Sequence, residues 1–252
     1  MGSVENINTS HSLRMDEHLT AMILVGGLGT RLRPVVSDRP KPMALVHGVP
    51  FLEILVDTLS RKGVTKIVLL TGYQGEVIET HFKSWHSAGS VILLSHEDKP
   101  LGTGGAIKHA ERFAGDPTLV VNGDTFLDVD IARLLDTHQR NQADVTLSLI
   151  EVPDVGRYGE VEVNENSRVT GFHEKQSGSS KPGLVNAGVS LLARDFIRRL
   201  PAQRPFSMET EVFPEVARSG RMFGVLQRGP FFDIGTPESY DAFKHFIQQR
   251  GV

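Results

Sequence analysis

The sequence predicts an α/β fold: a Rossmann-like, mixed but mostly parallel sheet flanked by helices, with a small antiparallel part toward the C-terminus. Apolar runs of strand length alternate with amphipathic stretches of helix length as far as residue 150, and such alternation is typical of βαβ units. A glycine-rich loop also follows the first apolar run directly. Ligands of such sheets bind at the carboxyl ends of the strands, where this loop is expected.

The first 150 residues contain most of the predicted sheet and its helices. We expect strands at 21–25, 67–70, 91–94, 118–121 and 145–150, and helices at 51–62, 75–83, 104–113 and 130–140. The last helix has clear signals, because Asp130 is a favourable N-cap and apolar side chains recur on one face. That face contains Ile131, Leu134, Leu135 and His138.

After residue 150 the pattern changes to antiparallel strands. Residues 158–175, YGEVEVNENSRVTGFHEK, alternate on both sides of an Asn-Glu-Asn turn, which is typical of a hairpin. We expect a strand at 184–192, a helix at 207–219 and a helix that begins with Thr236 as N-cap and Pro237 in its first turn. No repeat or long linker divides the chain. We therefore expect a single domain at 18–252 that follows a flexible tail at 1–17.

Composition excludes several classes of protein. The chain has 252 residues, of which 39% are hydrophobic and 23% charged, an ordinary balance for a globular protein. The net charge of −3 argues against a nucleic-acid surface, and the lack of cysteine excludes disulfides and zinc-thiolate sites. No apolar run reaches about 18 residues, the length of a membrane span, and no signal-peptide pattern opens the chain. We expect a cytoplasmic protein without nucleic-acid or membrane partners.

The glycine-rich loop has the composition of a phosphate-binding site. Residues 26–42 read GGLGTRLRPVVSDRPKP, so unobstructed backbone N–H groups stand beside the positive charges of Arg31 and Lys41. The loop is not a P-loop, because no lysine follows the glycines at the required spacing. It is not a dinucleotide fingerprint, because Leu32 stands where the third glycine belongs. We interpret it as a cradle for a nucleoside triphosphate.

Further motifs follow this loop in order. They are PLGTGGAI at 100–107, VNGD at 121–124, Glu174 with Lys175, NAG at 186–188 and FFDIGTPESY at 231–240. With these motifs the chain resembles the sugar-1-phosphate nucleotidylyltransferases, and most of all the D-glycero-D-manno-heptose 1-phosphate guanylyltransferase group. The resemblance implies the nucleotide-diphospho-sugar transferase fold. It also implies a Mg²⁺-dependent transfer of a nucleoside monophosphate from GTP, or another triphosphate, to a sugar 1-phosphate, with release of pyrophosphate.

The resemblance implies roles for individual residues. Asp124 and Asp233, which follow buried-looking strands, would hold Mg²⁺, an ion that prefers carboxylate oxygens. The catalytic cations would be Arg31, Lys41 and Lys175. The nucleotide-binding residues would be Leu24, Val25, Gly26, Gly27, Gly29, Thr30, Arg31, Lys41, Gly102, Thr103, Asn122 and Asp124. The sugar-binding residues would be Tyr158, Gly159, Glu174, Lys175, Asn186 and Gly188.

Glu97 is a separate nucleotide-binding candidate, because a carboxylate can pair with the N1–H and N2–H₂ donors of guanine. Residues 18–150 would bind mainly the nucleotide and residues 151–252 mainly the sugar. The histidines show no metal-binding spacing and are expected to be surface or packing residues, and Asp128 is expected to be solvated.

Alternative functions remain open. The same chemistry suits mannose 1-phosphate with GTP, or glucose or N-acetylmuramate 1-phosphate with another triphosphate. A non-catalytic nucleotide-sugar sensor is an alternative from a different class, and a dehydrogenase is a third. A homodimer is an assembly compatible with the sequence.

Overall fold

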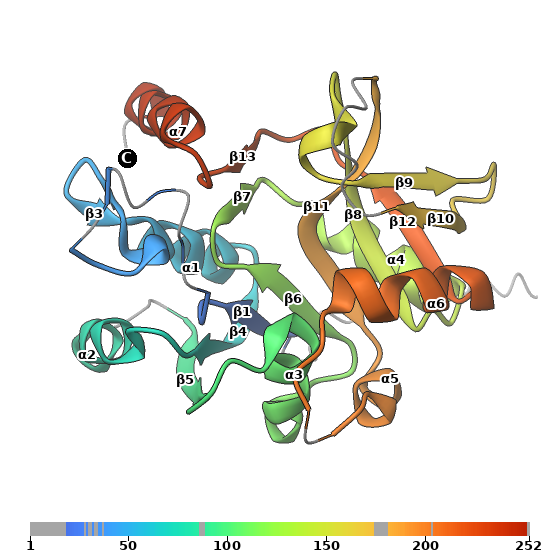
Figure 1. Cartoon of the computed structure of the whole chain (residues 1–252), viewed down its shortest axis with the longest axis horizontal. Coiled ribbons are helices and arrows are strands. Elements are labelled where there is room, and N and C mark those ends of the chain that lie inside the picture. Colours follow the sequence, from blue (N-terminus) through green and yellow to red (C-terminus); the bar gives the residue numbers. More distant parts are fainter. Residues whose placement is uncertain are drawn as a thin grey trace, which may run out of the picture.

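The computed structural model describes residues 19–27, 29, 32, 35–36, 38–85, 89–173, 181–202 and 204–250. In these residues a seven-stranded sheet has the strand order β12-β8-β11-β6-β1-β4-β5 (Figure 1). Its strands are β1 (Leu19–Leu24), β4 (Val64–Thr71), β5 (Val91–His96), β6 (Thr118–Asn122), β8 (Val145–Val152), β11 (Gly183–Leu192) and β12 (Met222–Leu226). The predicted tail at 1–17 lies outside the described residues.

The sheet is mixed, as predicted. β1 pairs in parallel with β4 and β6, β4 pairs in parallel with β5, and β8 pairs in parallel with β12. β11 lies between β6 and β8 and runs antiparallel to both. The strands predicted before residue 150 are confirmed. Four of them extend beyond their predicted ranges, whereas β1 begins before its predicted range and ends at Leu24, one residue short of it.

Helices cover the sheet and connect its strands. They are α1 (Phe51–Arg61), α2 (Gly75–Ser84), α3 (Gly102–His109), α4 (Ile131–Arg140), α5 (Arg194–Arg199), α6 (Phe213–Ser219) and α7 (Pro237–Arg250), with short 3-10 turns at Lys41–Met43, Glu111–Phe113 and Val155–Arg157. The predicted N-cap of α4 is confirmed, because Oδ1 of Asp130 accepts from Arg133 N at 3.0 Å. Within the described residues, no helix combines the length and apolar composition that crossing a bilayer requires.

Two helices differ from the prediction. The helix expected at 104–113 is α3, which begins at Gly102 and gives way to a 3-10 turn after His109. The first N–H groups of a helix have no acceptor within the helix. In α3 the carbonyl oxygen of Phe206 is the acceptor for two of them, Gly104 N at 3.0 Å and Gly105 N at 3.4 Å. A contact with residue 206 cannot be read from the local sequence.

The helix expected at 207–219 is divided. A π-helix, η5 (Met208–Val212), precedes α6. Pro214 has no N–H and cannot donate the α-helical hydrogen bond to the residue four positions before it, which permits the wider turn. Ser207 caps η5 as an N-cap, with Oγ accepting from Glu209 N and Thr210 N. Such wide turns are frequent at functional sites.

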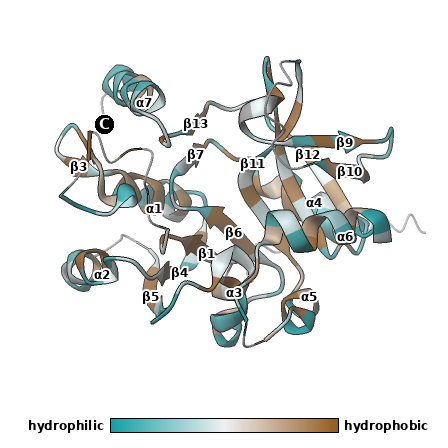
Figure 2. Ribbon diagram, in the orientation of Figure 1, coloured by the Kyte–Doolittle hydropathy of each residue, from teal (hydrophilic) through white to brown (hydrophobic). Residues whose placement is uncertain are grey.

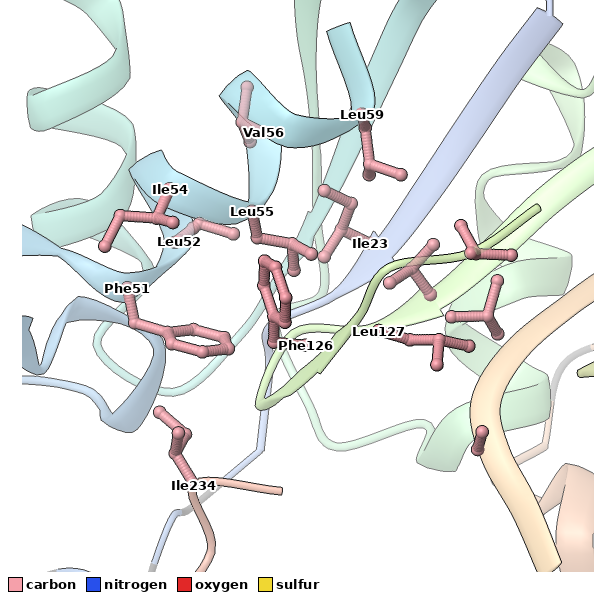
Figure 3. Packing of buried hydrophobic residues seen from close by; sticks show 14 of the residues in the cluster. Ile23, Phe51, Leu52, Ile54, Leu55, Val56, Leu59, Phe126, Leu127 and Ile234 are labelled. Atoms are coloured by element: carbon pink, nitrogen blue, oxygen red, sulfur yellow. The ribbon is translucent and has the colours of Figure 1, made fainter. Parts of the chain in front are cut away.

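Two apolar cores lie on opposite faces of the sheet. Ile23 packs with residues of α1, α2, α4 and α7, whereas Met22 packs with residues of α3, α5 and α6. Figure 2 shows the apolar strands inside the more polar helices. Phe51 of α1 lies 5.1 Å from Phe243 of α7, measured between ring centroids, and Phe126 packs beside α1 (Figure 3). Each large apolar side chain buried in this way contributes about 1.5–3 kcal/mol.

Small antiparallel ribbons lie beside the main sheet. β9 (Glu160–Val163) and β10 (Val169–His173) form the predicted hairpin. β2 (Leu45–Val46) pairs with β3 (Val49–Pro50). β7 (Thr125–Leu127) pairs with β13 (Phe231–Asp233), and this pair connects the end of β6 to the C-terminal part of the chain.

Candidate active site

The carboxyl edge of the sheet brings two predicted motifs together. β1 runs parallel to both β4 and β6, so the glycine loop and segment 122–124 leave the sheet at the same edge. Gly123 N donates to Leu24 O at 2.9 Å, and Val25 N donates to Leu70 O at 3.0 Å. The prediction that both motifs open on one edge is confirmed.

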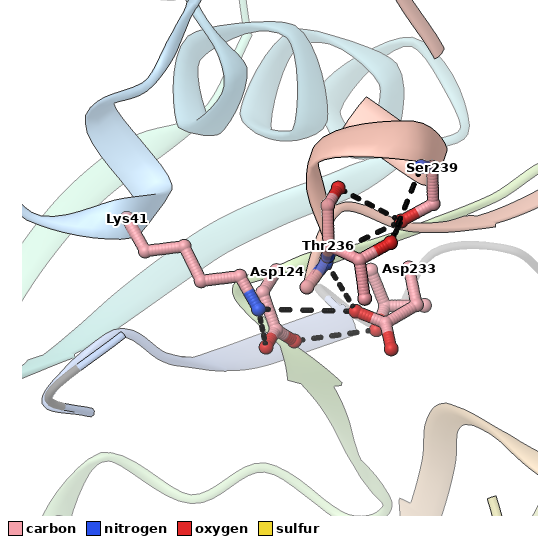
Figure 4. A network of polar contacts seen from close by, with 7 residues as sticks. Lys41, Asp124, Asp233, Thr236 and Ser239 are labelled. Atoms are coloured by element: carbon pink, nitrogen blue, oxygen red, sulfur yellow. Dashed lines mark hydrogen bonds and ion pairs between the residues drawn. The ribbon is translucent and has the colours of Figure 1, made fainter. Parts of the chain in front are cut away.

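Lys41 is buried at this edge against two carboxylates. It begins a 3-10 turn after Pro40, and its side chain is only 8% exposed. Nζ lies 2.7 Å from Oδ2 of Asp124 and 3.8 Å from Oδ1 of Asp233 (Figure 4). The contacts hold the ammonium group in place, because leaving the buried charge of Lys41 unpaired would be costly.

Backbone pairing brings Asp233 to this position. Asp233 faces Thr125 in the β7–β13 ribbon, and Ile234 N donates to Asp124 O at 3.0 Å. Gly235 N donates to Oδ1 of Asp233 at 2.8 Å, which fixes the carboxylate at the entrance to α7. The predicted convergence of Asp124 and Asp233 is therefore present.

The two carboxylates fit a Mg²⁺ ion. Oxygens of Asp124 and Asp233 already lie around one positive atom, the Nζ of Lys41. Mg²⁺ is usually held by one or two carboxylates together with substrate phosphates and water. Within the described residues, no group of three or more His, Cys, Asp or Glu side chains gathers at one point.

A cavity of about 530 Å³ opens beside the glycine loop. Every predicted nucleotide-binding residue that the structure describes lines it, namely Leu24, Val25, Gly26, Gly27, Gly29, Lys41, Glu97, Gly102, Thr103, Asn122 and Asp124. The cavity is also lined by Pro42, Leu70, Tyr73, Pro100 and Ala106, none of which was predicted as a binding residue. These residues add mostly apolar surface, the kind that packs against a flat base.

A second cavity, of about 310 Å³, adjoins the first. The two share Asn122 and Asp124. The second is also lined by Thr125, Tyr158, Phe172, Asn186, Ala187, Gly188, Ser207, Glu209, Thr210, Phe231 and Asp233. Gly159 is not among its lining residues, and its N–H donates to Val155 O at 3.0 Å.

Two glycines are required by the geometry of these cavities. Gly29 has φ +59°, and an added Cβ would lie 2.7 Å from Cβ of Lys41. Gly188 has φ +71°, and an added Cβ would lie 3.0 Å from Nδ2 of Asn122. Positive φ and close approach both favour glycine, so a side chain at either position would displace Lys41 or Asn122, which line the cavities.

Glu97 stands at the end of β5 in the wall of the first cavity. Glu97 N donates to Thr71 O at 2.9 Å, and Oε2 accepts from Leu101 N at 3.3 Å. Burial raises the pKa of the Glu97 carboxyl, although the Leu101 bond acts in the opposite direction. Desolvation of this kind strengthens whatever hydrogen bonds the carboxylate makes to a ligand.

Several predictions lie outside the described residues, namely those for Thr30, Arg31, Glu174 and Lys175. Asp128, predicted to be solvated, is 34% exposed and is also ion-paired, because its carboxylate lies 2.7 Å from Lys62 and 3.7 Å from Arg250. These contacts, led by the Lys62 hydrogen bond, lower the pKa of Asp128. Both partners come from distant helix ends, which local sequence does not reveal.

Glu209, which no sequence motif indicated, also lines the second cavity. Residues 207–219 carried only a helix signal, with no motif that marks a ligand. A helical pattern identifies the buried face but not which polar residue a π-turn directs to a cavity.

Comparison with known proteins agrees with this geometry. Residues 20–250 match the nucleotidyl transferase family. The chain is 39% identical to a D-glycero-alpha-D-manno-heptose 1-phosphate guanylyltransferase of Campylobacter jejuni, over 89% of this chain and 98% of that protein. It is also 39% identical to a mannose-1-phosphate guanylyltransferase of Mycobacterium tuberculosis, over 87% of this chain and 62% of that protein.

A solved structure is similar throughout. HddC from Yersinia pseudotuberculosis, in complex with GMP-PN, superposes with a TM-score of 0.80 and 33% identity, over 91% of this chain and 99% of that one. The chain therefore belongs to the nucleotidyl transferase family, and its predicted resemblance to the sugar-1-phosphate nucleotidylyltransferases is confirmed.

Proposed function

We propose that this protein transfers GMP from GTP to a sugar 1-phosphate, with D-glycero-alpha-D-manno-heptose 1-phosphate as the preferred acceptor. The observation that carries the proposal is the junction of two cavities. Lys41 lines the first cavity, Asp233 lines the second and Asp124 lines both. Such a junction suits a reaction between two bound substrates, because holding reactants side by side removes much of the entropic barrier.

In this proposal the first cavity binds GTP and the second binds the sugar. The glycine loop offers backbone N–H groups to the phosphates, and Glu97 accepts hydrogen bonds from guanine. A phosphate oxygen of the sugar 1-phosphate attacks the α-phosphorus of GTP, and pyrophosphate leaves. No covalent intermediate with the enzyme is needed. Residues 18–150 thus bind mainly nucleotide and residues 151–252 mainly sugar.

Charge neutralisation is the main task of the protein groups, since phosphoryl-type transfer depends on positioning and electrostatics. Asp124 and Asp233 are the residues that would hold Mg²⁺, which when bound offsets the negative charge of the phosphates. Lys41 orients the phosphates as a fixed, buried point charge. Arg31 and Lys175 stay predicted catalytic cations, the former for the triphosphate and the latter for the sugar phosphate.

The choice of heptose 1-phosphate as acceptor is supported by relatives that this chain covers over nearly their whole length. The heptose 1-phosphate enzyme of Campylobacter jejuni is covered to 98%, whereas the mannose-1-phosphate enzyme of Mycobacterium tuberculosis is covered to 62%. The GMP part of the ligand bound to HddC supports a guanine nucleotide. Mannose 1-phosphate is the second candidate acceptor.

A substrate panel tests the proposal. GTP, ATP, UTP and dTTP are each combined with heptose, mannose, glucose and N-acetylmuramate 1-phosphate, with Mg²⁺, and pyrophosphate release is measured. We expect the highest kcat/KM for GTP with heptose 1-phosphate. Binding of GTP without pyrophosphate release from any pair would favour the non-catalytic sensor instead. A cytoplasmic location and a homodimer stay predictions, the latter testable by light scattering.

A further inference from the structure

We propose that Glu209 determines sugar specificity by accepting a hydrogen bond from a hydroxyl of the sugar, and that Thr103 is a positioning residue for Glu209. This inference rests on the proposed function, since it assigns a residue to the sugar 1-phosphate in the second cavity. It concerns a carboxylate that lies outside the sequence motifs and outside the junction of Lys41 with the two aspartates.

Glu209 is placed in the second cavity by the π-helix η5. It lines this cavity together with Tyr158, Asn186 and Phe231. Among the described residues that line the cavity, none carries a positive charge. A carboxylate in such a wall needs hydrogen-bond donors rather than an ion pair.

One carboxylate oxygen of Glu209 is held by the protein. Oε2 accepts from Thr103 Oγ1 at 2.7 Å and from Ser207 Oγ at 2.9 Å. No described residue donates a hydrogen bond to Oε1, and Oε1 is not among the buried, unpartnered side-chain atoms. A carboxylate has about four acceptor positions. The group is therefore fixed through one oxygen and keeps its other oxygen accessible.

The negative charge of the Glu209 carboxylate favours a neutral hydrogen-bond donor as the partner of Oε1. An ionised carboxylate only accepts hydrogen bonds and repels a phosphate at close range. The phosphate of the acceptor would therefore lie toward Lys41 and the metal-binding aspartates, and a sugar hydroxyl would lie toward Glu209. The aromatic rings of Tyr158 and Phe231, whose centroids lie 5.7 Å apart, supply apolar surface beside the sugar ring.

Thr103 connects Glu209 to the nucleotide cavity. It lines the first cavity, while its hydroxyl donates to Glu209 and accepts from Met208 N at 2.9 Å. Both hydrogen-bonding roles of the hydroxyl are thus used to hold η5 on α3. Without the Thr103 donor, the carboxylate of Glu209 would lose its shortest contact and keep only the hydrogen bond from Ser207.

The test compares wild type with Glu209→Gln on a sugar series. Glutamine keeps an acceptor for Thr103 and Ser207 and places NH₂ where Oε1 stood. The substrates are GTP with the faster of heptose or mannose 1-phosphate, and with its 2-deoxy, 3-deoxy and 4-deoxy analogues. We expect Glu209→Gln to lower kcat/KM for the parent sugar by about 10- to 100-fold, mainly through KM for the sugar, with KM for GTP unchanged.

The analogues identify direct contact. The analogue that lacks the hydroxyl bound by Glu209 should lower kcat/KM of the wild type by a factor similar to that of the mutation. It should have little further effect on Glu209→Gln, because that variant has already lost the contact with this hydroxyl. If every deoxy effect is the same in both proteins, Glu209 does not touch the sugar and the inference fails. If the wild type itself releases no pyrophosphate with either parent sugar, the proposed function fails instead.

Positioning by Thr103 has its own readout. Thr103→Val removes the donor and should raise KM for the sugar, whereas Thr103→Ser retains the hydroxyl and should restore the wild-type KM. Equal sugar KM values for the two variants would overturn the positioning role. Glu215→Gln, on the exposed side of α6 and outside the lining of both cavities, is the matched control. Thermal unfolding of each variant checks that the fold is kept.

Discussion

The Nζ atom of Lys41 lies 2.7 Å from Oδ2 of Asp124, although 83 positions separate the two residues in the chain. The same nitrogen lies 3.8 Å from Oδ1 of Asp233. One buried ammonium group therefore stands at the oxygens predicted to hold Mg²⁺. In the proposed function, the lysine and the metal ion would compete electrostatically for one pair of carboxylates, so we expect Lys41 to affect metal binding and turnover in opposite directions.

Replacement of Lys41 should reduce turnover strongly. We expect Lys41→Met to lower kcat/KM by about 100- to 1000-fold, the range found when a preorganised electrostatic donor is removed. Pyrophosphate release at saturating Mg²⁺ measures the effect. Lys62→Met is the control, because Lys62 pairs with Asp128 away from both cavities. A Lys41→Met protein with nearly normal kcat/KM would contradict the proposed role.

Binding of Mg²⁺ in the absence of nucleotide should respond with two signs. Lys41→Met removes a competing positive charge and should tighten Mg²⁺ binding. Asp233→Asn removes a ligand charge and should weaken it, while its amide oxygen can still accept from Gly235 N. Isothermal titration with Mg²⁺ measures both, and Asp128→Asn is the control. Unchanged affinity in Asp233→Asn would place the metal elsewhere.

The base preference should depend on Glu97. Glu97→Gln replaces one acceptor oxygen by a donor and should reduce the GTP-over-ATP ratio of kcat/KM by about tenfold or more. Because burial raises the pKa of Glu97, the wild-type preference should weaken on acidification before an ordinary glutamate is protonated. Asp98→Asn, on the exposed neighbouring residue, is the control. If the ratio is unchanged in Glu97→Gln, Glu97 does not recognise the base.

Stability should fall with acidification through His138. Burial lowers the pKa of this histidine to about 4, and its Nδ1 lies 2.9 Å from Thr146 Oγ1. The unfolded state takes up the proton near pH 6.5. The contribution of neutral His138 to the free energy of unfolding is therefore complete above pH 6.5 and is lost as the pH falls to about 4. The loss should be about 3 kcal/mol, an order-of-magnitude value.

Urea unfolding between pH 4 and pH 7 measures this dependence. His138→Gln should have a flatter pH profile than wild type, whereas the exposed control His245→Gln should keep the wild-type slope. Parallel profiles for His138→Gln and wild type would show that another group governs the acid sensitivity.

Local patterns were sufficient for most of the elements. The cap at Asp130 and the apolar face of α4 predicted a helix at 130–140, and α4 spans Ile131–Arg140. The prediction at 207–219 was less accurate, since a π-helix capped by Ser207 precedes α6 there. The start of α3 was also missed, because Phe206 O satisfies its first N–H groups.

The sequence by itself determined the class of fold, the family and the candidate phosphate-binding loop, because glycine spacing, strand periodicity and charge are local properties of the chain. The family resemblance also predicted that Asp124 meets Asp233, but only the tertiary structure decided how distant groups are brought together. The antiparallel pairing of β7 with β13 brings Asp233 to Asp124, and the contact of η5 with α3 places Glu209 beside Thr103. These meetings depend on non-local backbone hydrogen bonds and on packing across the sheet, which no local pattern encodes.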